Sequence, residues 1–179
     1  MSSSQSRRQF MFRSAAGLGG LLLIHCTDPV DDWDIDDFVE VGCPPIEVAK
    51  LDDLTEGVPL DFDYPVAGLE CFLVKLGEPA DQGIGPDGDI VAFSYLCTHM
   101  GCSLKERYNH EHKVLGPCHC HFTTFSLRKR GLVVVGQATQ NLVQVQVHLE
   151  GDAIIATGLE GLIYGELANR CKDDEEQSA

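Results

Sequence analysis

Short stretches of alternating or continuous apolar residues run through the middle of the chain, separated by glycine, proline and aspartate. The clearest is Leu142–Leu149 (LVQVQVHL), where apolar and polar residues alternate as in a strand with one face in water. Many short stretches with turn residues between them are typical of a β-sandwich or barrel. The predicted strands are Ile46–Leu51, Pro59–Pro65, Glu70–Gly77, Asp89–Cys97, Gly131–Gly136, Leu142–Leu149, Ala153–Gly158 and Leu162–Gly165.

Signals for helix are weak in this part of the chain. One short helix is predicted near Leu51–Glu56, where two acidic residues would lie in its first turn. Pro79–Asp89 is predicted to be a loop because of its glycine, proline and aspartate content. His148 falls on the polar phase of its strand, so its side chain is predicted to be exposed. The predicted fold class is therefore all-β.

The two ends of the chain differ from this β-rich middle. Residues 1–26 contain Arg7 and Arg8 followed by the apolar stretch Ala15–Ile24, which indicates a twin-arginine (Tat) export signal and a periplasmic protein. That stretch is shorter than the roughly 20 residues that span a bilayer. Membrane contact is therefore expected only if the leader is retained. Residues 27–42 are predicted to be an acidic linker, and residues 171–179 an acidic tail.

Overall charge restricts the possible partners. The 179 residues include 28 acidic and 13 basic ones, which gives a formal net charge of −15. Nucleic acid is excluded as a partner, because binding it requires a basic surface. The length between the linker and the tail, residues 43–170, suits one domain.

Two short loops hold most of the residues that can bind a metal. CTHMGC contains Cys97 and His99, and CHCH contains Cys118 and His121. The order C-x-H-x-x-C followed by C-x-C-H is what a Rieske [2Fe–2S] centre requires, with one cysteine and one histidine from each loop. The spacing assigns Cys97 and Cys118 to one iron, and His99 and His121 to the other. A structural zinc site and a framework of disulfides alone are the alternatives.

The remaining cysteines are expected to serve another purpose. Cys102 and Cys120, one from each loop, are predicted to form a disulfide that ties the loops together, provided that their Cα atoms lie within about 7 Å. The other four cysteines allow three pairings, and the sequence does not choose among them. These four are Cys26, Cys43, Cys71 and Cys171.

The segments CTHMGC and GPCHCHFTTF resemble Rieske proteins of the disulfide-containing type. The resemblance implies an antiparallel β-sandwich base domain with a small inserted cluster-binding subdomain, about Phe93–Asn141. It also implies that groups at Thr123 and Phe125 tune the reduction potential, where the family usually has serine and tyrosine. Phe125 has no hydroxyl, so the predicted potential is below that of a quinol-oxidising Rieske protein. His119 replaces the usual proline and is predicted to point away from the iron.

A wider resemblance covers Pro59–Arg170. VKLGEPADQGIGPDGDIVAFSYLCTHMGC and GQATQNLVQVQV…GLEGLIYGELANR are similar to the small subunit of the periplasmic arsenite oxidase family. This implies an electron-transfer subunit that turns over no substrate by itself. Its partners would be a large molybdopterin-containing catalytic subunit and a cytochrome c or cupredoxin. Arsenite oxidase is the expected complex.

Three alternatives stay open for the function. The first is the small subunit of iodate reductase, a close relative in which electrons flow toward molybdenum instead of away from it. The second is a quinol-oxidising Rieske subunit, which would need a full membrane anchor. The third is a metal-binding module without redox function.

Overall fold

The computed structural model describes residues 42–166, 169 and 171. The predicted Tat signal, Cys26 and nearly all of the acidic linker and tail lie outside these residues. Within them, regular structure consists of strands and two short 3₁₀ turns, so the all-β prediction is confirmed. No helix in the described part is long and apolar enough to cross a membrane.

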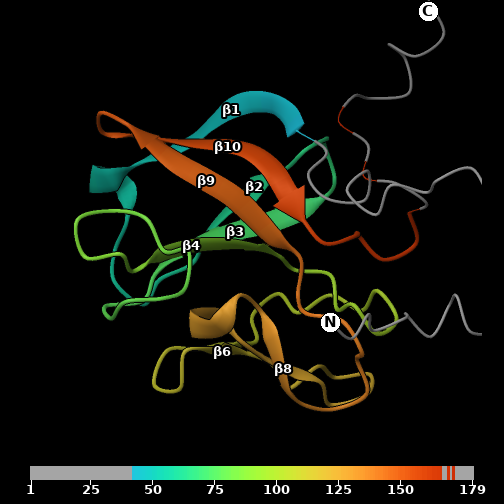
Figure 1. Cartoon of the computed structure of the whole chain (residues 1–179). Helices are drawn as coiled ribbons and strands as arrows, with labels where there is room; N and C mark the ends of the chain where they lie inside the picture. Colours follow the sequence, from blue (N-terminus) through green and yellow to red (C-terminus); the bar gives the residue numbers. More distant parts are fainter. Residues whose placement is uncertain (1–41, 167–168, 170, 172–179) are drawn as a thin grey trace, which may run out of the picture. The chain divides into compact units, whose positions relative to one another are not determined.

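The strands form two antiparallel sheets (Figure 1). The larger sheet has the order β1-β10-β9-β4-β3-β2, and the smaller sheet has the order β5-β6-β7-β8. The strands of the larger sheet are β1 (Gly42–Lys50), β2 (Leu60–Asp63), β3 (Glu70–Lys75), β4 (Ile90–Ser94), β9 (Gln144–Glu150) and β10 (Ala153–Glu160). Those of the smaller sheet are β5 (Tyr108–Asn109), β6 (Val114–Leu115), β7 (Thr124–Ser126) and β8 (Leu132–Val135).

Every predicted strand except one overlaps an observed strand. The prediction for Leu162–Gly165 is wrong, because this segment is a turn in which the Ile163 N–H donates to Asn169 Oδ1 at 3.0 Å. The helix predicted near Leu51–Glu56 shortens to a 3₁₀ turn, η2 (Leu51–Asp53). The predicted loop at Pro79–Asp89 contains no strand, as expected.

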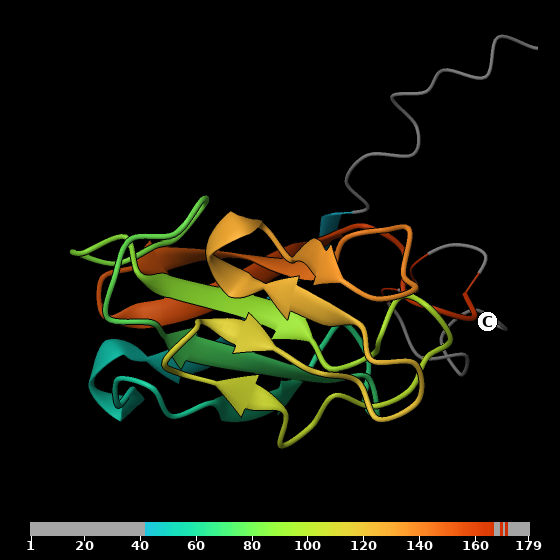
Figure 2. The ribbon, with the colours of Figure 1, turned by 90° about the horizontal axis from the view of Figure 1, so that it is seen from below.

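Strands β3 and β4 of the larger sheet are buried on both faces. In β3, Phe72 and Val74 point into one core, while Cys71 and Leu73 point into the other. Strand β4 alternates in the same way. The first of these cores is shared with the smaller sheet, which lies against this face of the larger one (Figure 2). Strands β3 and β4 therefore form the wall between two apolar cores.

Strand β9 departs from the alternation expected for it. His148 is exposed, as predicted, but Gln144 on the same phase is only 4% exposed. Gln144 lies between Phe93 of β4 and Glu160 of β10 in the sheet register. The segment Gln140–Leu142, which leads into β9, lines the same cavity as Gln144. The polar side chain at the start of β9, Gln144, is therefore covered, whereas that of His148 near its end is in water.

Two of the cysteines that the sequence left open are joined. A disulfide links Cys43, in β1, to Cys171, with a Cα–Cα distance of 5.0 Å. Cys71 is a buried thiol whose Sγ donates to the carbonyl of Tyr64 at 3.4 Å. Burial, with a smaller effect from the charge of Asp63, raises the pKa of this thiol to about 12. Cys71 therefore behaves as a small apolar residue.

Candidate metal centre

The first loop, residues 97–102, begins shortly after β4 ends. The Cys97 N–H donates to the Cys102 carbonyl at 3.0 Å, and the Gly101 N–H donates to the Cys97 carbonyl at 2.8 Å. Gly101 has φ of 70°, a conformation that glycine adopts without steric cost. A bridge between Leu96 and Ser103 closes the base of the loop.

The second loop, residues 118–123, lies between β6 and β7 and repeats this scheme. The Cys118 N–H donates to the Thr123 carbonyl at 2.8 Å, and the Phe122 N–H donates to the Cys118 carbonyl at 2.8 Å. Phe122 stands where Gly101 stands in the first loop and also has a positive φ, 59°. The two loops are therefore two copies of one backbone turn, and each begins with a cysteine.

The structure brings the four predicted metal ligands together as two pairs. Cys97 and Cys118 are each 1% exposed, and both lie in the same core, where Cys118 affects the electrostatics of Cys97. The rings of His99 and His121 have centroids 4.5 Å apart and planes at 86°. The sulfur pair lies in the core shared by the two sheets, while the histidine pair is nearer to solvent.

The chemistry of these donors fits a metal centre with two sulfur and two nitrogen ligands. The Nδ1 atom of His99 is buried and has no hydrogen-bond partner among the described residues. Burial, with a smaller effect from Cys118, raises the pKa of the Cys97 thiol, whereas the backbone N–H groups of His99 and Met100 lower it. Two adjacent buried thiolates require positive charge beside them, which a metal ion supplies.

Thr123 and Phe125 lie close to the four predicted metal ligands in the chain, and both are fully buried. The Thr123 Oγ1 accepts hydrogen bonds from the backbone N–H groups of Gln137 at 3.1 Å and Ala138 at 3.3 Å. Its own hydroxyl hydrogen is thus left for another acceptor. Phe125 packs in the same core as the two cysteine ligands and has no hydrogen to donate.

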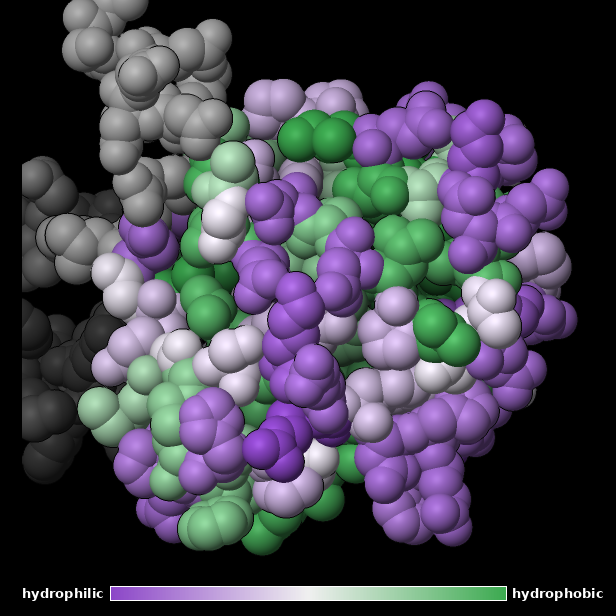
Figure 3. Space-filling view, turned by 180° about the vertical axis from the view of Figure 1, so that it is seen from behind, coloured by the Kyte–Doolittle hydropathy of each residue, from purple (hydrophilic) through white to green (hydrophobic). Residues whose placement is uncertain are grey.

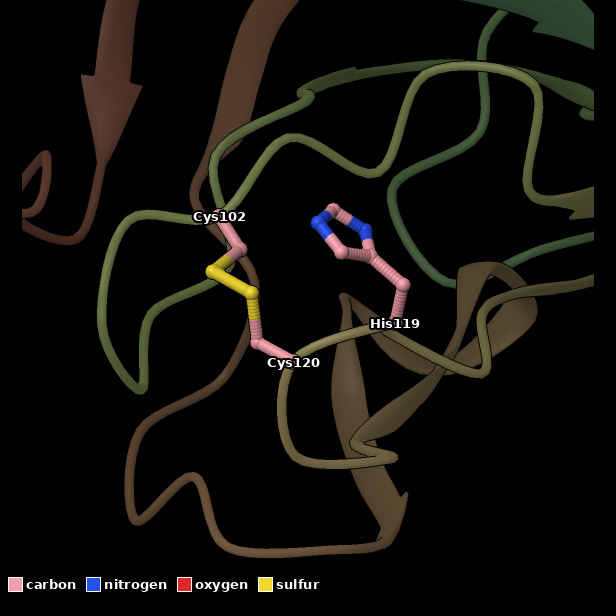
Figure 4. A group of neighbouring side chains, drawn as sticks. All are labelled: Cys102, His119 and Cys120. Atoms are coloured by element: carbon pink, nitrogen blue, oxygen red, sulfur yellow. A yellow bond between two sulfur atoms is a disulfide. The ribbon is translucent and has the colours of Figure 1, made fainter.

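Cys102 and Cys120 are joined by a disulfide with a Cα–Cα distance of 6.6 Å. The imidazole of His119 lies beside it, with a ring nitrogen within 4.8 Å of both sulfur atoms (Figure 4). Sulfur atoms bonded to each other are not thiolates, so these three residues are not a metal site while the disulfide is intact. His119 is exposed, as expected for a residue outside the ligand group.

The sequence analysis did not identify two close contacts that hold the ligand loops in place. Gly136 presses on Thr123, since a Cβ at this glycine would lie 2.7 Å from Thr123 Oγ1. Tyr164 packs on Gly101, where a Cβ would lie 2.6 Å from the tyrosine ring. These two contacts could have been inferred from the glycines, because a side chain at either position would clash with its neighbour.

The comparison with sequence families gives one match, the Rieske [2Fe-2S] domain, at residues 45–147. Among curated proteins, the chain is 46% identical over 127 residues to the iodate reductase subunit IdrB of Denitromonas iodatirespirans. It is 49% identical over 118 residues to the iodate reductase subunit IdrB of Pseudomonas sp. (strain SCT). These matches cover 71% and 66% of this chain, and 69% and 62% of the relatives.

A solved structure shares the fold. The soluble domain of the Rieske protein II (soxF) from Sulfolobus acidocaldarius superposes with a TM-score of 0.64 at 24% sequence identity. The superposition covers 78% of this chain and 89% of that one. The expected fold, an all-β Rieske fold built from antiparallel sheets, is therefore confirmed.

Proposed function

The chain belongs to the Rieske [2Fe–2S] family, and from this premise we propose that it is the electron-transfer subunit of an iodate reductase. The identity of 46–49% to two iodate reductase subunits carries the proposal. Arsenite oxidase was the complex expected from the sequence, with iodate reductase as the alternative. The measured similarity favours that alternative.

The proposal gives each residue of the site a role. The thiolates of Cys97 and Cys118 hold one iron, and the imidazoles of His99 and His121 hold the other. The bound [2Fe–2S] cluster supplies one-electron redox chemistry. Neutral imidazoles add less negative charge than thiolates, so this ligand set raises the potential above that of an all-cysteine centre.

The protein surroundings divide this site into a dry side and an exposed side. The two cysteines are buried in the core, so water is excluded from the sulfur ligands. His121 is exposed and His99 is partly exposed, which leaves a short path from the histidine side to a docked partner. Thr123 has a hydroxyl hydrogen free for a cluster sulfur, and such hydrogen bonds raise the potential.

Reduction of iodate consumes electrons, so this chain passes them toward the substrate. The family resemblance supplies the partners: a cytochrome c or cupredoxin as donor, and a large molybdopterin-containing subunit as acceptor. Turnover of iodate belongs to that large subunit, because the four ligand side chains of this chain are committed to the cluster.

We also propose that the protein is exported by the Tat route and works in the periplasm. Arg7 and Arg8 before a short apolar stretch support the route. The disulfides Cys43–Cys171 and Cys102–Cys120 support an oxidising compartment, since such bonds are rare in the cytosol.

Electron paramagnetic resonance of the purified complex tests the function. We expect dithionite to produce the signal of a reduced Rieske cluster and iodate to abolish it, whereas arsenite added to the oxidised complex produces no signal. A signal that appears with arsenite would make the complex an arsenite oxidase. A chain without iron and acid-labile sulfide would refute the cluster itself.

A further inference from the structure

Strand β8 is the exposed edge of the smaller sheet. It pairs with β7 on one side, and the sheet order ends there. Leu132, Val134 and Val135 are 50%, 58% and 60% exposed. Natural proteins protect such edges with charged residues, proline or a covering segment, and β8 itself contains neither a charge nor a proline.

Three of the four residues of β8 are exposed apolar side chains, so they line one short edge of the smaller sheet. Val58 and Ile46, by contrast, are exposed singly in other parts of the larger domain. On the face opposite to that of Figure 1, apolar residues form several groups that polar residues separate from one another (Figure 3). Single exposed apolar residues are normal, whereas a contiguous apolar group marks an interaction site.

This edge adjoins the second ligand loop. The residues that follow β8 turn toward Thr123, where Gln137 and Ala138 donate their backbone N–H groups to its hydroxyl. Thr124 of β7 is paired with Val135 of β8. A segment that docks on β8 therefore lies beside the loop that carries Cys118 and His121.

We propose that an uncharged, extended segment of the catalytic subunit adds to β8 as a further strand of the smaller sheet. Strand addition takes its affinity from main-chain hydrogen bonds and its specificity from alternate side chains. In this chain the free main-chain edge would supply the hydrogen bonds, and the exposed leucine and valines would supply the apolar contact. The inference rests on the proposed function, because that function provides the catalytic subunit.

Charge decides against the acidic linker of this same chain as the occupant. Three basic residues precede β8, and each is already paired with a carboxylate. The pairs are Arg128 with Glu78 at 2.9 Å, Lys129 with Asp81 at 3.2 Å, and Arg130 with Glu160. No basic side chain of this run is left to attract the acidic residues of 27–42, so a neutral segment fits the edge better.

Electron transfer decides against a second copy of the chain. Two copies paired through β8 would fill the edge beside the second ligand loop with a chain that has no role in the proposed transfer to molybdenum. The catalytic subunit is the partner that must come close to the cluster. Docking beside the second ligand loop meets that need.

A cavity next to the start of β8 is a second, independent indication that a partner binds near this edge. The cavity has a volume of about 370 Å³ and is lined in part by Arg130, Gln144 and Leu162. The side-chain carbonyl of Gln144 has no hydrogen-bond partner among the described residues, although the residue is almost fully buried. Such a group is costly to leave unpaired.

The test compares two valine-to-lysine variants in the cluster-loaded subunit. Val134→Lys changes the edge, and Val58→Lys is the matched control, because Val58 is 54% exposed but lies in a loop before β2. We expect Val134→Lys to weaken binding to the purified catalytic subunit by about tenfold or more, with an unchanged melting temperature and cluster spectrum. Val58→Lys should bind as the unchanged chain does.

Hydrogen exchange distinguishes strand addition from simple apolar contact. The backbone amides of residues 132–135 should exchange more slowly in the complex than in the free subunit. Equal binding by both lysine variants, or unchanged exchange at β8, would overturn the inference. So would a homodimer of the free subunit that Val134→Lys disperses. The response of the complex to iodate is a separate measurement, so a complex that assembles through β8 but ignores iodate would overturn only the proposed function.

Discussion

Single side chains around the cluster set its reduction potential. The four proposed ligands were predicted from the spacing of two short motifs, and the structure brings these side chains together as a cysteine pair and a histidine pair. They are Cys97, His99, Cys118 and His121. The hydroxyl of Thr123 was predicted as a neighbour, but the two backbone donors that hold its oxygen were not. Those donors come from residues that are distant in sequence, and backbone groups have no signature in a sequence.

Phe125→Tyr is expected to raise the reduction potential. The new hydroxyl can donate to the cluster, and a net hydrogen bond of about 1 kcal/mol corresponds to about 40 mV for one electron. Redox titration followed by electron paramagnetic resonance measures the change. Phe62→Tyr is the control, since Phe62 packs against the other core. A midpoint that does not rise in Phe125→Tyr would contradict this account of the potential.

Cys71 is expected to make the protein sensitive to alkaline pH. Its pKa is raised from the ordinary 9.0 to about 12, so the unfolded chain loses this proton at lower pH than the folded chain. The stabilisation is complete below pH 9 and is lost as the pH rises toward 12. Chemical denaturation of Cys71→Ala across this range should show a shallower loss of stability. The same slope in both proteins would exclude Cys71 as the cause.

At the level of elements, long alternating stretches were predictable and very short ones were not. Strand β9 contains enough residues to show a period of two in its sequence, and β10 contains a longer apolar stretch. Strands β5 and β6 have two residues each, which is too few for any period. Of the smaller sheet, the sequence pattern predicted only β8, and a separate cluster-binding subdomain was expected from the family resemblance. The apolar run at Leu162–Gly165 misled because its residues pack without pairing with a strand: Ile163 is buried in the second core and Tyr164 packs on Gly101.

The disulfide between the ligand loops is expected to stabilise the centre without binding metal. Removing it as Cys102→Ser with Cys120→Ser frees a cross-link across 18 residues, which typically costs about 3 kcal/mol. The cluster spectrum should persist at low temperature, while the melting temperature falls. Cys97→Ser should instead abolish the spectrum. If both variants lost iron equally, the ligand assignment would be wrong.

At the scale of the whole molecule, one long-range link joins the beginning of the described chain to its end. Cys43 and Cys171 are separated by 128 residues, and the sequence permitted other pairings. Their neighbours belong to the core on the far side of β3 and β4 from the ligand cysteines. This disulfide is therefore expected to stabilise the domain without affecting the cluster site.

Cys43→Ser with Cys171→Ser is expected to lower the free energy of unfolding by about 4–5 kcal/mol, as for other very long loops. The reduction potential should stay the same, because no ligand or hydrogen bond of the centre changes. Denaturant unfolding and a redox titration on the same preparation measure both quantities. A shifted potential would show that the two cores are coupled more closely than the packing indicates.

The wall formed by β3 and β4 also limits how the protein can move. Side chains of both cores pack against β3 and β4, and β4 leads into the first ligand loop. The centre cannot swivel on a hinge while the base stays still, because such a rotation would open a packed interior. Within the described residues, the two ligand loops are therefore fixed relative to the larger sheet. The rate of electron delivery should depend on how the domain as a whole meets its partners, and hardly at all on flexing between its two sheets.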